Sequence, residues 1–192
     1  MSRPSVAIAL VLGAAAPAAA VTTPPPTPAN ARLQGQFNLT GLVTVAENVR
    51  GERPGQTVTR TWTFTPTCAT GVCSTIALVR SRAAGSDRLV LGLRGPGYYV
   101  GTGRFFAPLR CGRRTWRRGS VVPFTISVEV TAAALAGSEI VATHIRATYT
   151  NRSRSNRTPC VAVLGHDAAV YTGLFVGAAP PSGSTATGGG GS

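Results

Sequence analysis

The stretch TRTWTFTPTCATGVC, residues 59–73, determines how the rest of the chain is interpreted. In its first half, large residues alternate strictly with threonine. The large residues that share one face are Val58, Arg60, Trp62 and Phe64. A period of two in β-branched and aromatic residues is typical of a half-buried β-strand. Pro66 ends this strand, because proline has no backbone donor for the ladder.

A short turn follows the strand. Cys68 and Cys73 flank it, Gly71 lies within it, and a second apolar run begins directly afterwards. We therefore predict a strand, a turn closed by a disulfide, and a second strand.

Similar alternating runs recur between clusters of Gly, Pro, Asn and Arg, most clearly from Val121 to Thr131. We expect strands at residues 36–46, 56–65, 74–80, 88–93, 98–106, 121–131, 139–150, and 160–164 with 168–172. A short helix or turn is compatible with residues 132–135. Short connections between one-sided strands indicate an antiparallel meander around a shared core.

The predicted fold class is all-β, as a small up-and-down β-barrel of about eight strands, since barrel closure removes exposed edges. A β-sandwich is the alternative. A sandwich of the immunoglobulin type places its cysteines on core strands, whereas the first two cysteines here lie in a turn.

The chain ends differ in composition from its middle. Residues 1–20 combine Arg3, an apolar run and Ala18-Ala19-Ala20, the pattern of a cleaved signal peptide. A Pro/Thr linker follows at 21–31, then a β domain at 32–177 and a flexible Gly/Ser tail at 178–192. We expect a secreted, extracellular monomer with no stable membrane span after cleavage. An uncleaved N-terminal tether is the alternative.

The four cysteines are Cys68, Cys73, Cys111 and Cys160. An even number in an exported chain indicates disulfides, and three pairings are possible. The pairing of Cys68 with Cys73 is the most local, and Cys111 with Cys160 would then follow. A four-cysteine zinc site fits less well, because only one pair is close in sequence. We expect no metal and no cofactor.

All 19 basic residues are arginine, and the formal net charge is +13. Loss of Arg3 with the signal peptide leaves 18 arginines and six acidic residues, a net charge of +12. Such a charge makes polyanions plausible partners.

Two arginine-rich segments stand out as candidate anion-binding sites. The candidate residues are Arg110, Arg113, Arg114, Trp116, Arg117, Arg118, Arg154 and Arg157. Guanidinium groups bind phosphate or carboxylate in pairs of hydrogen bonds, and Trp116 offers a stacking surface. We expect contact with an anionic cell-envelope polymer. Solvated loop arginines are the equally weighted alternative, and no nucleic-acid motif is present.

Catalytic motifs are absent from the sequence. There is no GxSxG or HExxH, and the adjacent His166 and Asp167 need not meet in space. Glu129 and His144 lie opposite the apolar faces of their strands, where we expect solvent. We therefore predict a non-catalytic binding or structural module. A secreted hydrolase is one alternative, and a barrel that holds a small apolar ligand beside Trp62 and Phe64 is another.

The segment WTFTPTCATGVC, residues 62–73, with Arg80 shortly after it, resembles uncharacterised exported β-proteins of high-GC Gram-positive bacteria. The resemblance covers most of residues 34–173. It implies export and a disulfide-bonded β domain, and it carries no activity or site residues. A weaker likeness is to lipocalin-like barrels, from which this chain differs because Trp62 lies on the second strand rather than the first.

Non-reducing peptide mapping of the exported protein should recover Cys68 joined to Cys73 and Cys111 joined to Cys160. The close spacing of the first pair favours the local bond, and the second pair follows from it. Free thiols, or a peptide that joins Cys68 to Cys111, would contradict this pairing.

Overall fold

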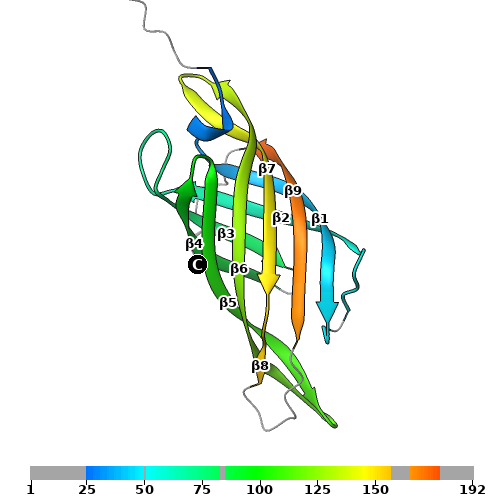
Figure 1. Cartoon of the computed structure of the whole chain (residues 1–192). Coiled ribbons are helices and arrows are strands. Elements are labelled where there is room, and N and C mark those ends of the chain that lie inside the picture. The colour runs from blue at the N-terminus through cyan, green and yellow to red at the C-terminus, as the bar shows by residue number, and fades with distance from the viewer. Residues whose placement is uncertain (1–24, 50, 83–84, 157–164, 178–192) are drawn as a thin grey trace, which may run out of the picture.

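The computed structural model describes residues 25–49, 51–82, 85–156 and 165–177. Within them the chain forms nine strands and one short 3-10 helix (Figure 1). The elements are η1 (Pro28–Asn30), β1 (Gly35–Glu47), β2 (Thr57–Pro66), β3 (Thr75–Arg82), β4 (Gly85–Gly95), β5 (Tyr98–Cys111), β6 (Arg114–Ala136), β7 (Glu139–Asn151), β8 (Ser155–Asn156) and β9 (His166–Gly177).

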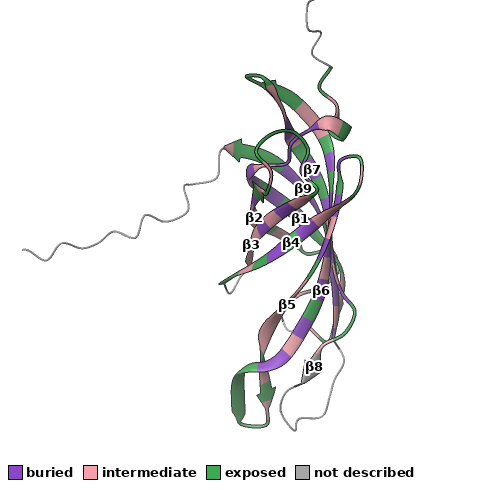
Figure 2. Ribbon diagram, turned by 90° about the vertical axis from the view of Figure 1, so that its left-hand side faces the viewer, coloured by how far each residue is buried: buried purple, intermediate pink, exposed green. Residues whose placement is uncertain are grey.

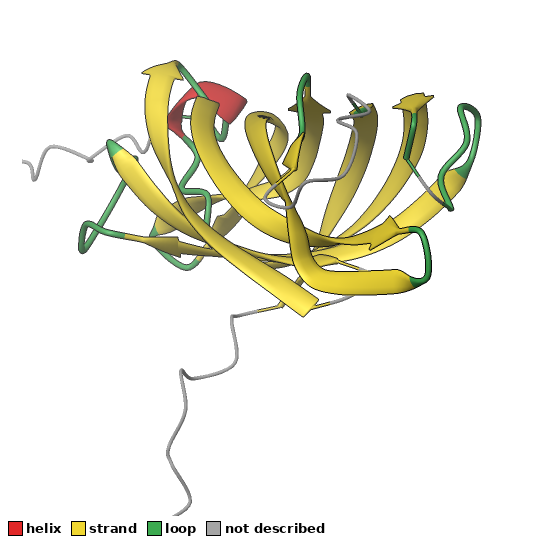
Figure 3. Ribbon diagram, turned by 90° about the horizontal axis from the view of Figure 1, so that it is seen from below, coloured by secondary structure: helices red, strands yellow, loops and turns green. Residues whose placement is uncertain are grey.

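Eight of these strands close into an antiparallel barrel. Each strand from β1 to β6 pairs with the strand that follows it, and β9 pairs with both β7 and β1. The two-residue β8 lies outside the ring and pairs only with Ser120 and Val121 of β6. Seen from below, the strands curve round a common interior (Figure 3). The predicted all-β, up-and-down, eight-stranded barrel is therefore confirmed.

The alternating residues of β2 build the core as predicted. Trp62 and Phe64 are each 1% exposed, while Thr61 and Thr63 alternate with them on the opposite face and are less buried. Phe37 of β1 is the direct ladder partner of Trp62, and its ring meets the edge of Phe64 at 5.4 Å between centroids. The ring centroid of Tyr171, on β9, lies 5.5 Å from that of Trp62. Aromatic side chains of three adjacent strands thus fill the interior at this level, and Trp62 is a core residue.

Two sequence predictions need correction, and three fall outside the described residues. Residues 132–135 continue β6 as strand, with ladder irregularities near Ala132, instead of forming a helix or turn. Strand β6 also begins earlier than predicted, at Arg114. The predicted strand at 160–164, the signal peptide and the C-terminal tail lie outside the described residues.

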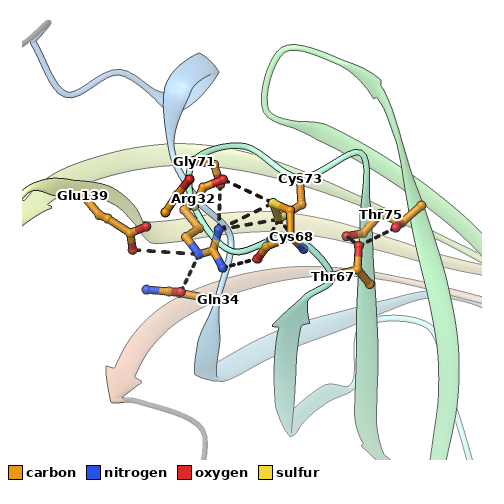
Figure 4. Close-up of a disulfide and its surroundings, with 9 residues drawn as sticks. Arg32, Gln34, Thr67, Cys68, Gly71, Cys73, Thr75 and Glu139 are labelled. Carbon is orange, nitrogen blue, oxygen red and sulfur yellow. Dashed lines mark hydrogen bonds and ion pairs between the residues drawn. A yellow bond between two sulfur atoms is a disulfide. The ribbon is translucent and has the colours of Figure 1, made fainter.

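Arg32 closes one end of the barrel, beside the disulfide that joins Cys68 to Cys73 (Figure 4). Its Nη2 donates to the carbonyl of Cys68 at 2.7 Å, and its Nη1 donates to the carbonyl of Gly71 at 3.1 Å. The backbone of Arg32 also pairs with β7, through Ile140 and Ala142. One buried guanidinium therefore ties the disulfide turn to the opposite wall. Since both sulfurs are joined in a disulfide, they are not thiolate ligands for zinc.

At the other end, the strands separate. The β2–β3 ladder runs only from Trp62 to Pro66 on β2, and the β4–β5 ladder includes only three residue pairs. Beyond these ladders, β5 and β6 continue together as a two-stranded ribbon that extends past the ends of β1 and β7 (Figure 1). We call this end the barrel mouth.

Replacement of Trp62 by Ala should lower the free energy of unfolding by about 3–5 kcal/mol, because it leaves a large cavity in a packed interior. Denaturant unfolding followed by circular dichroism would measure the loss. Trp116→Ala is the matched control, since Trp116 is 43% exposed and its loss should change stability by less than about 0.5 kcal/mol. Equal effects of the two substitutions would contradict the core assignment.

Candidate functional site

Five of the predicted anion-binding arginines lie on the protruding β5–β6 hairpin, which we call the arginine ribbon (residues 109–118). Arg110, Arg113, Arg114, Arg117 and Arg118 are all exposed. Figure 2 shows the tip of this hairpin as largely exposed. None of the described carboxylates forms an ion pair with these five side chains.

The arginines occupy both faces of the ribbon. Arg110 is the ladder partner of Thr115, and Cys111 is the partner of Arg114. Direct partners share a face and successive residues alternate, so Arg110 and Arg114 lie on opposite faces. Arg118 stacks over the ring of Phe106 at 3.9 Å, which fixes the base of the ribbon.

The second predicted arginine segment does not form one free cluster with the first. Arg154 is largely buried, and its Nη2 lies 2.7 Å from Oδ1 of the buried Asp167. Its charge is therefore already compensated. Arg157 and Cys160 lie outside the described residues, so the Cys111–Cys160 bond stays a prediction.

The barrel mouth contains a cavity of about 250 Å³ that the sequence did not reveal. Its charged lining residues are Glu52, Arg60, Arg80, Arg82, Arg154 and Asp167. Phe105, Tyr149 and Tyr171 supply its aromatic walls. The lining therefore combines four guanidinium groups with two carboxylates and three rings.

Arg80 is one of the two most deeply buried of these charges, at 5% exposure, together with Asp167. Its Nη2 lies 2.8 Å from Oδ2 of Asp87, which is its direct ladder partner on β4. The same carboxylate oxygen lies 2.8 Å from Nε of Arg82. Burial lowers the pKa of Arg80, and Asp87 opposes this shift. One carboxylate thus holds two guanidinium groups in the wall of the cavity.

Aromatic rings complete the environment of Arg80. Its guanidinium carbon lies 3.9 Å from the centre of the Phe124 ring and 4.9 Å from that of Tyr149. Cation–π contacts of this kind are strongest where water is excluded. Gly103, the ladder partner of Phe124, makes the arrangement possible, because a Cβ at that position would overlap the Phe124 ring.

Tyr171 also lies opposite a glycine, which leaves room for its ring beside the cavity. Its ladder partner on β1 is Gly41, and a Cβ there would overlap the Tyr171 ring. Burial raises the pKa of Tyr171, so the phenol stays neutral. Because Gly41 has no side chain, the uncharged ring of Tyr171 can lie against β1 and form one wall of the cavity.

Asp167 organises the opposite side of the cavity. It pairs with Arg154, and its negative charge acts on the hydroxyl of Tyr149. Burial, reinforced by the negative charge of Asp167, raises the pKa of Tyr149. Burial likewise raises the pKa of Glu52, and Asp167 adds to this shift. The neutral form of Glu52 is therefore favoured relative to an exposed glutamate.

The residues that a hydrolase would need are not brought together at the mouth. His166 Nδ1 lies 3.9 Å from Glu47 on the rim, and neither histidine lines the cavity. His144 and Glu129 are exposed on the outer surface, as predicted. Within the described residues, no group of three His, Cys, Asp or Glu side chains is placed to hold a metal ion. The described part of the chain also contains no helix that is long and apolar enough to cross a membrane.

No known protein family, curated protein or solved structure matches this chain. The interpretation of both sites therefore rests on their geometry.

Sequence reasoning missed the Arg80–Asp87 pair, although a signal for it exists. Arg80 has the same parity as the buried Ile76 and Leu78 on β3, and Asp87 has the same parity as Leu89 and Leu91 on β4. When two oppositely charged residues each continue the inward-facing apolar series of their own strand, and the two strands form a hairpin, an internal ion pair is indicated.

Replacement of Asp87 by Asn should destabilise the fold by about 3–5 kcal/mol, because it leaves Arg80 buried without a counter-charge. Chemical denaturation would measure the change. Glu129→Gln is the matched control on the exposed outer face and should have little effect.

The double variant Arg80→Met with Asp87→Leu tests the reason for the loss. It removes both charges of the pair, and it should recover most of the stability that Asp87→Asn loses. A fully stable Asp87→Asn protein would show that the pair does not hold the wall.

Proposed function

We propose that the chain is an exported, non-catalytic β-barrel module that contacts an anionic cell-envelope polymer through the arginine ribbon. The observation that carries this proposal is the projection of five exposed arginines beyond the barrel on one two-stranded hairpin. Export is supported by the signal-peptide pattern of residues 1–20 and by the disulfide between Cys68 and Cys73, which suits an oxidising compartment.

The ribbon suits a polymer better than a compact partner. Like charges so close together repel, so negative charge from outside the chain would stabilise them. Arginines on both faces of the ribbon can contact successive phosphates or carboxylates of a polymer chain that lies along the ribbon or wraps around it. Trp116, which is 43% exposed, adds a flat apolar surface for the uncharged parts of such a polymer.

The energy of such contacts is mainly electrostatic, so it weakens as salt screens the charges. The ribbon should therefore bind polymers of both the phosphate and the carboxylate type, and its affinity for each should fall strongly as the salt concentration rises.

The test is retention on a heparin column and on a teichoic-acid column across a salt gradient. Replacement of Arg113, Arg114, Arg117 and Arg118 by Ser should move elution to clearly lower salt, because it removes the clustered charge. The matched control replaces the four exposed arginines Arg53, Arg88, Arg94 and Arg146, which lie away from the ribbon.

Both variants lose the same charge, so the comparison separates position from net charge. The ribbon variant should elute earlier than the control variant on both columns. Equal shifts would mean that net charge alone governs retention, and the ribbon would then be no binding site.

A further inference from the structure

We propose that the cavity at the barrel mouth is a second, independent binding site, which takes a small organic anion with a single carboxylate and a compact apolar or aromatic body. This site differs from the arginine ribbon in its residues, its enclosure and its ligand class.

The charges that surround the cavity do not cancel. Arg80 and Arg82 share Asp87, and Arg154 pairs with Asp167. Arg60 also lines the cavity, and among the described residues no carboxylate lies within ion-pair distance of it. The polar contact of its guanidinium that the described residues provide is a 2.8 Å hydrogen bond to the carbonyl of Thr59.

Glu52 is the remaining carboxylate of the lining. Its partial burial beside Asp167 favours the neutral acid, as described above. The cavity therefore carries an excess of one positive charge when Glu52 is ionised and of two when it is protonated. An entering carboxylate restores neutrality when Glu52 is ionised and leaves one positive charge when Glu52 is protonated. A second negative charge on the ligand would have to compete with Asp167.

The guanidinium groups are held in place before a ligand arrives. Arg82 is fixed through its Nε by Asp87, and it stacks over Phe105 with its guanidinium carbon 4.4 Å from the ring centre. Arg80 is fixed by the same carboxylate and by three rings. Groups that are already ordered lose little conformational entropy on binding, which favours affinity for a small ligand.

The size and walls of the cavity define the rest of the ligand. About 250 Å³ is less than the roughly 300 Å³ at which pockets for drug-sized ligands begin, so the ligand is small. Tyr149, Tyr171 and Phe105 offer ring faces, and Val43, Val58 and Ala169 offer aliphatic contact. A purely apolar ligand would displace water from the guanidinium of Arg60 without supplying a negative charge, which is unfavourable.

The experiment measures binding of butyrate, hexanoate and benzoate to the mature protein by isothermal titration calorimetry, with benzamide as the uncharged analogue of benzoate. At least one of the three carboxylates should bind at one site per chain. Benzoate should bind at least about tenfold more tightly than benzamide, because hydrogen bonds to charged groups contribute about 1.5–3 kcal/mol.

Arg60→Gln is the informative variant, since it removes the uncompensated charge and leaves the Arg80–Asp87 pair intact. It should weaken binding of the carboxylate by about tenfold or more. Arg88→Gln is the matched control, because Arg88 lies on β4 but is exposed and outside the cavity lining. It should leave the affinity unchanged, and thermal melts should show that both variants fold.

The proposal is overturned if none of the three carboxylates binds, if benzamide binds as tightly as benzoate, or if Arg60→Gln and Arg88→Gln have equal affinities. The four-arginine ribbon variant should bind the carboxylate as the parent protein does, which separates this site from the polymer contact. Loss of binding in that variant would also contradict an independent site.

Discussion

The buried guanidinium of Arg80 is the constraint on which the arrangement of the barrel mouth depends. A guanidinium that is 5% exposed needs a counter-charge and aromatic rings around it, and the neighbouring strands supply these groups. Strand β4 supplies Asp87 as the direct ladder partner, and β6 and β7 supply the rings of Phe124 and Tyr149. Gly103 on β5 leaves the space that Phe124 occupies. The register of four strands is thereby tied to one side chain.

Arginine serves three physical roles in this chain, and burial decides among them. Arg32 closes the end beside the disulfide, where backbone carbonyls and Gln34 accept its hydrogen bonds and Glu139 lies 3.9 Å from its Nε. Arg80 and Arg154 are members of buried ion pairs. The ribbon arginines are solvated and have no described carboxylate partner. The same functional group therefore closes one end of the barrel, shapes the cavity at the other, and provides the exposed charge beyond it.

The two proposed sites are contiguous along one pair of strands. Phe105 and Pro108 line the cavity, and the arginine ribbon begins at the next residue of β5. The barrel interior above the cavity is filled by Trp62, Phe37 and Phe64, so the cavity does not continue through the molecule. The packed part of the barrel thus presents a small, partly open cavity and an extended charged surface at one end.

Local sequence patterns predicted the fold class, most of the strand positions, the core role of Trp62 and the local disulfide. These features follow from period-two alternation and from a short turn between two cysteines, both of which are local along the chain. The sequence also located the ribbon arginines, because exposed charge clusters are visible in composition. Only the tertiary structure decided that Arg154 is compensated by Asp167, that Arg80 and Asp87 face inward as a pair, and that a charged cavity forms between them. Those features depend on which strands become neighbours around the ring and on where their ladders stop. Strand register brings together residues that are distant in sequence, and local alternation alone does not specify it.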